Sequence, residues 1–359
     1  MRSMLLLSAG LALLAACNQN LPVYSNVEDL RILAVRAEPP AYLFDRTDAA
    51  LTFDALVVDP LGGPVDFSWS FCPVESLRAC ADFDDLNAQV APAFQPTLTA
   101  AHALGLTGTA VPADASPDLP SADTLRPYAI ATFTLPADQL ALLAPYYLSD
   151  QFFGFGMGIW PSAVLTLTRP GDSVTGYKRF VASVADLSAY NDLVQSTFGY
   201  FFCPPGQTEN CIPWQPDLAV NHNPVFAGLQ WSEGKTPLAT WQDLPTDGPL
   251  HVKVAASVRI LPSFTPESAE PYQVLQTNLE TQVVEVQPAV EDISVAWFST
   301  AGKLQDPLTW PKFTKTLDTV YTAPDTQPQA TNGLVTLWLV ARDQRGGESW
   351  AHVDVMVDP

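Results

Sequence analysis

The sequence predicts an all-β protein made of two antiparallel β-sandwiches. Its 33 prolines and its short stretches of alternating apolar and polar residues favour strands and turns over long helices. Apolar residues make up 47% of the 359-residue chain, which is enough to fill a sizeable core. A chain of this length is expected to form two domains, which we place at residues 28–185 and 222–359.

The first sandwich begins with three strands joined by short turns. Leu30–Ala37 alternates apolar and polar residues and ends before Pro39, which cannot donate to a sheet ladder. Leu51–Val58 is the second strand, and Asp59–Pro64 has the composition of a turn. Val65–Phe71 alternates again and is the third strand. Consecutive short strands of this kind are typical of an antiparallel sandwich.

An insertion at residues 81–124 interrupts this pattern, because it is rich in Ala, Pro, Asp and Thr and lacks clear periodicity. We expect one helical turn in it, near Asp84–Gln89. Pro136–Leu143 predicts a short helix, with proline in its first turn and an acid near its positive end. The remaining strands of the first sandwich are expected at residues 128–135, 155–159, 163–168 and 177–183.

A segment rich in Cys and Pro, residues 186–221, connects the two predicted sandwiches. The second sandwich starts at Asn223–Leu229. Its last two strands, Leu334–Ala341 and Trp350–Val357, flank a loop that contains two glycines, and they are therefore predicted to form a hairpin. Further strands are expected at residues 250–260, 282–286, 293–300 and 319–321.

Four cysteines besides Cys17 indicate two disulfides, since an even number in an exported chain is typical of a disulfide framework. Three pairings are possible. Equal spacing and the same opening tripeptide, Phe-Cys-Pro, favour Cys72–Cys80 and Cys203–Cys211. A zinc site is the alternative, but it would need CxxC-like spacing or neighbouring histidines, and neither is present.

Residues 1–16 have the pattern of a secretory signal, with a basic start at Arg2, a short apolar run and small residues at the end. The apolar run is about a dozen residues, too short to span a bilayer as a helix. Leu14-Ala15-Ala16-Cys17 resembles the lipobox of bacterial lipoproteins. In that family the cysteine is acylated and becomes the first residue of the mature protein. The resemblance therefore implies a lipid anchor at Cys17 and a tether at residues 17–27.

The residues after the cysteine, Asn18-Gln19-Asn20, lack the aspartate that retains many Gram-negative lipoproteins in the inner membrane. The resemblance therefore implies attachment to the outer membrane, on either its periplasmic or its cell-surface face. An ordinary cleaved signal with an accidental cysteine is the alternative interpretation.

Several segments resemble uncharacterised Gram-negative lipoproteins that carry two immunoglobulin-like sandwiches. These segments are Leu30–Pro40, Asn223–Leu229 and Val295–Gly302. The strand–turn–strand around Ala341–Gly347 resembles the final hairpin of immunoglobulin-like modules in bacterial surface proteins. The resemblance implies two immunoglobulin-like folds, with a short helix and long loop insertions in the first, and it brings no catalytic residues.

The chain is strongly acidic. Without residues 1–16, which contain one basic residue, it carries 16 basic and 38 acidic residues and a net charge of −22. So acidic a chain is expected to repel nucleic acid and anionic lipid surfaces. We therefore expect no nucleic-acid partner.

No pattern in the sequence indicates catalysis or a cofactor. The four histidines form no HExxH motif, and no G-x-S-x-G elbow is present. Asp82, Asp84 and Asp85 offer oxygens to calcium, but their loop lacks the glycine and the distant glutamate of an EF-hand. A solvated loop or the start of a helix is the preferred interpretation of these acids, and no metal is predicted.

Nine tryptophans suggest sugar binding, because sugar rings stack on exposed aromatic faces. Trp69, Trp297 and Trp338 lie in alternating strand patterns and are predicted to be core residues. Trp214 and Trp310 lie beside prolines, and they are the candidates for contact with a ligand.

These features together predict a lipid-anchored, non-catalytic protein of the cell envelope that acts as a binding or structural module, with an envelope protein or a glycan as its partner. The segments at 81–124 and 186–221 are its expected function-bearing parts. Within the second, Tyr200–Phe202 either packs beneath the disulfide or forms an apolar patch for a partner. Two alternatives stay open: a carbohydrate-binding lipoprotein that uses loop aromatics, and a secreted hydrolase with an unrecognised site.

Overall fold

Strands dominate the structure, a computed structural model, and most of them pair antiparallel, which confirms the predicted all-β class. The strand expected at 155–159 lies outside the described residues, as do Cys17 and Cys80. The described residues are 24–46, 49–73, 82–112, 128–147, 160–203, 207, 209–236, 240–245, 248–277 and 284–359.

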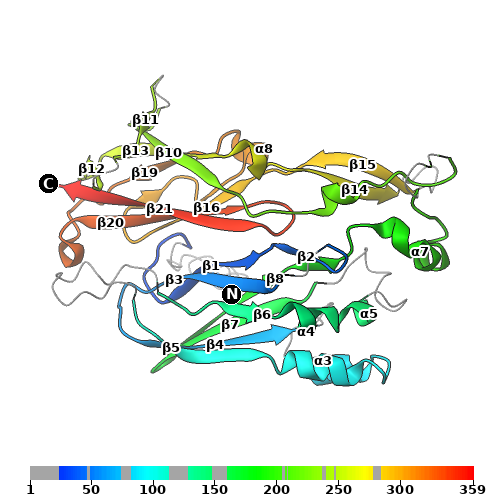
Figure 1. Ribbon diagram of the computed structural model, residues 1–359. Coiled ribbons are helices and arrows are strands. Elements are labelled where there is room, and N and C mark those ends of the chain that lie inside the picture. Colours follow the sequence, from blue (N-terminus) through cyan, green and yellow to red (C-terminus); the bar gives the residue numbers. More distant parts are fainter. Residues whose placement is uncertain are drawn as a thin grey trace, which may run out of the picture.

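The first sandwich contains a three-stranded and a four-stranded antiparallel sheet (Figure 1). Two short strands, β2 and β9, pair in parallel beside them. The three-stranded sheet is β1 (Arg31–Glu38), β3 (Leu51–Val58) and β6 (Phe133–Leu135); the other is β5 (Gly105–Ala110), β4 (Val65–Cys72), β7 (Ser162–Arg169) and β8 (Asp172–Arg179); the parallel pair is β2 (Ala41–Leu43) and β9 (Val181–Ser183).

Aromatic side chains fill the core between these two sheets. Trp69 is buried, as predicted, and its ring stacks on Phe133 with centroids 5.8 Å apart. The indole Nε1 donates to the carbonyl of Ala131 at 3.2 Å, so burying this polar group leaves no unsatisfied donor. The alternating pattern of β4 therefore directs its aromatic residues into the core.

The insertion at 81–124 has more regular structure than its sequence indicates. α2 (Phe83–Ala88) agrees with the helical turn expected there, and α3 (Gln95–His102) follows it. β5 then pairs with β4 along six residue pairs, so the described part of the insertion belongs to the first sandwich. The short helix expected at 136–143 forms as α4 (Ala137–Ala141), with α5 (Ala144–Tyr147) after it.

The connecting segment is partly helical, with η3 (Leu187–Tyr190), α7 (Asn191–Phe198) and η4 (Pro216–Ala219). Within it, Cys203 and Cys211 form the predicted disulfide. Cys72 is also disulfide-bonded, and its predicted partner Cys80 lies outside the described residues.

The second sandwich consists of two five-stranded sheets and a projecting hairpin, β14–β15 (Figure 1). Short helical segments in its loops are η5 (Pro266–Ser268), α8 (Pro311–Thr314) and η6 (Gln329–Thr331). The strands are, in sheet order, β11 (Gln242–Asp243), β10 (Phe226–Glu233), β13 (Ser257–Phe264), β19 (Thr319–Thr322) and β17 (Lys303–Leu304), then β12 (Leu250–Lys253), β21 (Glu348–Asp358), β20 (Leu334–Arg342), β16 (Ser294–Ser299) and β18 (Leu308–Thr309), with β14 (Pro271–Thr277) and β15 (Val284–Val290) forming the hairpin.

The single strand predicted at residues 250–260 is two strands in the structure. β12 ends at Lys253, β13 begins at Ser257, and they belong to different sheets. Ala255 lies between them with φ 58°. An alanine in the left-handed region is uncommon, and the apolar pattern runs on through this turn, so no sequence signal separates the two strands.

The two sandwiches pack face to face through an apolar layer that is separate from both cores (Figure 1). β20 shows the arrangement: Leu337 and Leu339 face the core of the second sandwich, whereas Trp338 faces the first sandwich. Trp338 is therefore buried, as predicted, but between the sandwiches. The layer consists of Val27, Leu33, Ala34, Leu56, Val58, Ala296, Phe298, Trp338 and Val340.

The chain that precedes β1 is fastened to the second sandwich. The ring of Tyr24 lies 5.7 Å from that of Phe298. The backbone N–H of Val27 donates to the carbonyl of Ser299, and the Ser299 N–H donates to the carbonyl of Ser25, both at 2.8 Å. Within the described residues, no helix combines the length and the apolar character needed to cross a membrane.

Candidate functional site

An open pocket of about 830 Å³ lies where the first sandwich, the connecting segment and the β14–β15 hairpin meet. Residues of β2, β14 and β15 line this junction pocket, and these strands gather with α7 at one end of the molecule (Figure 1). Its walls come from β2 and β9, from the connecting segment, from the hairpin and from the loop between β20 and β21. Segments far apart in sequence therefore build one concave surface.

Five aromatic residues from separate parts of the chain line the junction pocket: Trp160, Phe180, Tyr200, Trp214 and Tyr272. Trp160 is 52% exposed, which is unusual for so large an apolar group. Aromatic and aliphatic side chains with a few polar groups are typical of pockets that bind small molecules.

The structure brings one of the two predicted contact tryptophans into the pocket. Trp214 lines the pocket. Two contacts hold its side chain in place: the indole Nε1 donates to the carbonyl of Ala185 at 2.8 Å, and the ring lies 5.4 Å from that of Phe202. Trp310 is not among the described residues of the pocket. It packs against Phe313 instead, with ring centroids 4.8 Å apart.

The run Tyr200–Phe202 divides between the protein interior and the junction pocket. Phe202 is fully buried, and its backbone N–H and carbonyl are both held by the Asn191 side chain, at 2.8 and 2.7 Å. Tyr200 packs edge-on against Phe202 at 6.0 Å and lines the pocket. The disulfide segment therefore supports one wall of the junction pocket.

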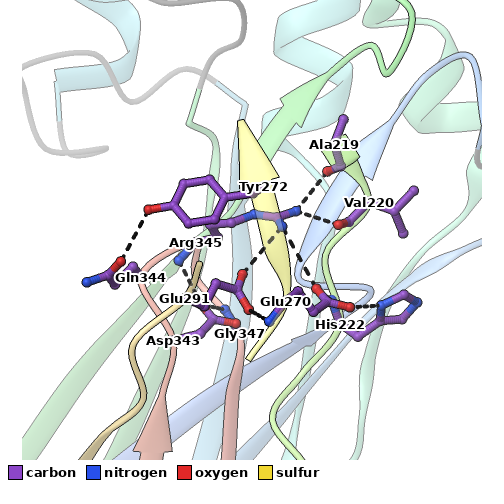
Figure 2. A network of polar contacts seen from close by, with 10 residues as sticks. All are labelled: Ala219, Val220, His222, Glu270, Tyr272, Glu291, Asp343, Gln344, Arg345 and Gly347. Carbon is purple, nitrogen blue, oxygen red and sulfur yellow. Dashed lines mark hydrogen bonds and ion pairs between the residues drawn. The ribbon is translucent and has the colours of Figure 1, made fainter. Parts of the chain in front are cut away.

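A polar network around Arg345 forms another part of the pocket (Figure 2). Arg345 Nη2 donates to the carbonyls of Ala219 and Val220, at 2.9 and 2.5 Å. The guanidinium lies over the ring of Tyr272, 5.4 Å from its centroid, and the Tyr272 hydroxyl donates to Gln344 Oε1 at 3.2 Å. Arg345 thus ties the connecting segment to the hairpin.

Two glutamates at the base of the hairpin face Arg345 (Figure 2). Its Nη1 lies 3.4 Å from Glu291 Oε1 and 3.9 Å from Glu270 Oε2. The two acids are also joined to each other, because the Glu270 backbone N–H donates to Glu291 Oε2 at 3.1 Å. On its other side, Glu270 accepts from the backbone N–H of His222 and pairs with its imidazole Nδ1.

A third acid, Asp343, organises the loop between β20 and β21. Its Oδ1 accepts from the backbone N–H groups of Arg345 and Gly347, both at 2.7 Å. Gly347 favours this close approach, since a Cβ at that position would collide with the Asp343 carboxylate as it is placed. The loop is therefore folded around a carboxylate that points into the network.

Burial changes the acidity of two of these carboxyls. Burial, followed by repulsion from Asp343, raises the pKa of Glu291 from 4.5 to about 7, against the lowering effect of Arg345. Burial also raises the pKa of Asp343, although backbone N–H groups of its own loop lower it. Glu291 therefore changes charge near neutral pH.

The other predicted metal and site residues lie away from the junction pocket. Asp84 and Asp85 are in the first turn of α2, and Asp82 precedes that helix, which agrees with the preferred interpretation as a helix start. Among the described residues, no group of three or more His, Cys, Asp or Glu side chains is placed to hold a metal ion. His102 stacks on Phe83, with ring centroids 3.9 Å apart.

The sequence did not single out Arg345, Glu270 or Glu291. Asp343–Gly347 has the composition of a hairpin loop, and the simplest expectation for such a loop is exposure to solvent. Arg345 instead contacts residues more than fifty positions away, at 219–220, 270 and 291. The available signal was two charged residues, Asp343 and Arg345, within a tight glycine-containing turn, which is weak by itself.

No protein-family model matches the chain, and no curated protein matches it in sequence. A nucleoside hydrolase-related hypothetical protein from Saccharophagus degradans, associated with carbohydrate metabolism, is 11% identical over 50% of this chain and 34% of that chain, with a TM-score of 0.21. Red sea bream transglutaminase is 8% identical over 93% of this chain and 32% of that chain, with a TM-score of 0.22. The D0-D1 domain of intimin is 10% identical over 91% and 99%, with a TM-score of 0.18. The chain spans about a third of the length of the first two, and similarities of this size carry no argument about function.

Proposed function

We propose that this protein is a lipid-anchored, non-catalytic binding protein of the bacterial envelope, and that the junction pocket is its ligand site. The observation that carries the proposal is the construction of the pocket. Its walls belong to two sandwiches that share a buried apolar layer and to a connecting segment held by a disulfide and by Arg345. A pocket with walls fixed in this way is largely formed before a ligand arrives.

The lipid anchor rests on the sequence around Cys17. Cys17→Ser is expected to move the protein from the membrane fraction to the soluble fraction of lysed cells, because acyl chains on this residue would supply the membrane affinity. Asn18→Ser, which keeps the cysteine, is the matched control and should stay in the membrane fraction. A Cys17→Ser protein that still needs detergent for extraction would contradict the anchor.

The ligand site can be tested on intact cells with a photo-crosslinking residue. We expect the residue to form a covalent adduct at Gln344, which is exposed and lines the pocket, and not at Leu61, which is 67% exposed in a distant turn. Val274→Trp, which adds volume inside the pocket, should reduce the adduct at Gln344. Identical adducts at both positions, or none at Gln344, would count against the pocket.

A carbohydrate ligand is the second candidate, and the aromatic lining favours it. Trp160, Tyr200 and Tyr272 line the same pocket as the predicted contact residue Trp214, and sugar rings stack on aromatic faces. A glycan array should show binding that is at least about tenfold weaker with Trp160→Ala. Trp310→Ala is the matched control, since Trp310 is outside the pocket. Equal loss in both variants, or no glycan bound, would remove this candidate.

A further inference from the structure

The polar network and the junction pocket share one wall. Tyr272, Gln344 and Arg345 belong to both. The network joins three segments: the end of the connecting segment, the base of the β14–β15 hairpin and the loop 343–347 (Figure 2). Any change that loosens the network therefore moves a wall of the proposed ligand site.

The network holds more negative than positive charge. Glu291 is faced by Glu270 and Tyr272 from the hairpin, and by Asp343 and Arg345 from the loop 343–347. Behind these, His222, just after the connecting segment, pairs with Glu270, and Asp292 contacts Gln344. Lys178 of the buried Lys178–Glu348 pair donates to the carbonyl of Gly346. The three inner carboxyls, Glu270, Glu291 and Asp343, share a single arginine.

Two of the inner carboxyl oxygens lack a hydrogen-bond donor. Glu291 Oε1 and Asp343 Oδ2 are both buried without one, although Arg345 Nη1 lies 3.4 Å from the former. A buried acceptor without a donor costs about 1–3 kcal/mol. One proton on either carboxyl would supply a donor and remove one negative charge at the same time.

We propose that Glu291, Asp343 and Arg345 form a proton-linked latch, which holds the hairpin and the loop 343–347 against the connecting segment when one proton is bound and loosens them when it is released. The latch would regulate the junction pocket, and it rests on the proposed function only in taking that pocket as the ligand site. Its partners are side chains of this chain alone, so the latch operates whatever the ligand is.

The acidity of Glu291 supports a working range near neutral pH. Burial and the neighbouring Asp343 raise the pKa of Glu291 to about 7. At pH 6 the proton is mostly bound, and the carboxyl is neutral beside Asp343. At pH 8 the proton is mostly released, and a second buried carboxylate adds to the repulsion within the network.

Hydrogen exchange of the full chain in detergent tests the latch directly. Exchange corrected for the intrinsic rate should be about threefold or more faster at pH 8 than at pH 6 in residues 270–277, 284–291 and 343–347. Glu291→Gln should remove this difference, because glutamine is neutral at both values. Glu267→Gln is the matched control: Glu267 is exposed in the neighbouring turn, and the variant should keep the difference.

Two outcomes would overturn the latch: equal exchange at both pH values in the unaltered protein, or a pH difference that persists in Glu291→Gln. Asp343→Asn provides a second neutral variant if Glu291→Gln fails to fold, and it should also reduce the difference. Neither result bears on the anchor or on the ligand site, because the crosslinking at Gln344 and the fractionation of Cys17→Ser are separate measurements made at one fixed pH on proteins whose network is unaltered.

Discussion

Lys178 and Glu348 form an ion pair across the two sandwiches, with Lys178 Nζ 3.1 Å from Glu348 Oε2 and with side chains only 10% and 6% exposed. Lys178 also donates to the Gly346 carbonyl at 2.8 Å, and Glu348 Oε1 lies 2.7 Å from Arg342 Nη2. The pair joins β8 of the first sandwich to the start of β21 in the second. A charge buried in this way is tolerated only with its partner present.

Lys178→Met should therefore destabilise the whole molecule. The change leaves Glu348 buried with Arg342 alone, and breaking a buried pair costs about 3 kcal/mol. Denaturant unfolding followed by tryptophan fluorescence measures the loss. Lys253→Met, at an exposed position of β12, should change the unfolding free energy by less than about 0.5 kcal/mol. A similar value for both variants would show that the pair does not stabilise the interface.

Trp338→Ala should separate the unfolding of the two sandwiches. The side chain is 2% exposed in the apolar layer between them, and truncating a buried tryptophan costs about 3–5 kcal/mol. Because the loss falls on the interface, calorimetry should show two transitions where the unaltered protein has one. Trp160→Ala, which truncates a half-exposed ring, should keep the single transition. One transition in the Trp338→Ala protein would contradict this coupling.

Stability should fall as the pH rises from about 5 to about 7. The folded protein holds a proton on Glu291, whose pKa is raised from 4.5 to about 7, in a range where the unfolded chain has lost it. This stabilisation is therefore complete below the pKa of Glu291 in the unfolded chain. It is lost as the pH rises through the pKa of Glu291 in the folded protein. The full effect is on the order of 3 kcal/mol. Denaturant midpoints measured across this range should decline, and Glu291→Gln should flatten the curve. A midpoint that rises with pH in the unaltered protein, or one that is unaffected by the substitution, would contradict the assignment.

Removing the Cys203–Cys211 disulfide should weaken one wall of the pocket. Replacing both cysteines by alanine opens a short loop, at a cost of about 2–3 kcal/mol in the chain-entropy model. Phe202 is the buried residue next to the bridge, so Trp214, which packs on it, should become more exposed. Quenching of tryptophan fluorescence by acrylamide would detect this. Unchanged stability and quenching would mean that Asn191 alone holds the segment.

The strands were predictable where their faces alternate or where a strand is apolar throughout. Leu51–Val58 coincides with β3, and Leu334–Ala341 matches β20 almost fully. β20 is apolar along its length because one face meets the core of its own sandwich and the other meets the first sandwich. The break at Ala255 was missed because positive φ at an alanine leaves no compositional mark.

The candidate site was predictable only in fragments. Trp214 and the Cys203–Cys211 loop were identified from local features, a proline-flanked aromatic residue and an eight-residue spacing. Arg345 and Glu291 were not, since their roles depend on contacts between the loop 343–347, the base of the β14–β15 hairpin and residues 219–220, which are far apart in the sequence. A buried charge cluster has no period and no spacing, so it becomes visible only in the folded chain.

The attachment of the N-terminal segment to the second sandwich limits how far the folded body can lie from a lipid anchor at Cys17. Because Ser25 and Val27 are hydrogen-bonded to Ser299, only residues 18–23 and Tyr24 separate an acylated Cys17 from the folded body. A fully extended chain of that length reaches at most about 25 Å. Acylation of Cys17, as proposed, would therefore hold the folded body within about 25 Å of the bilayer surface. A ligand would then meet the protein close to the lipid headgroups.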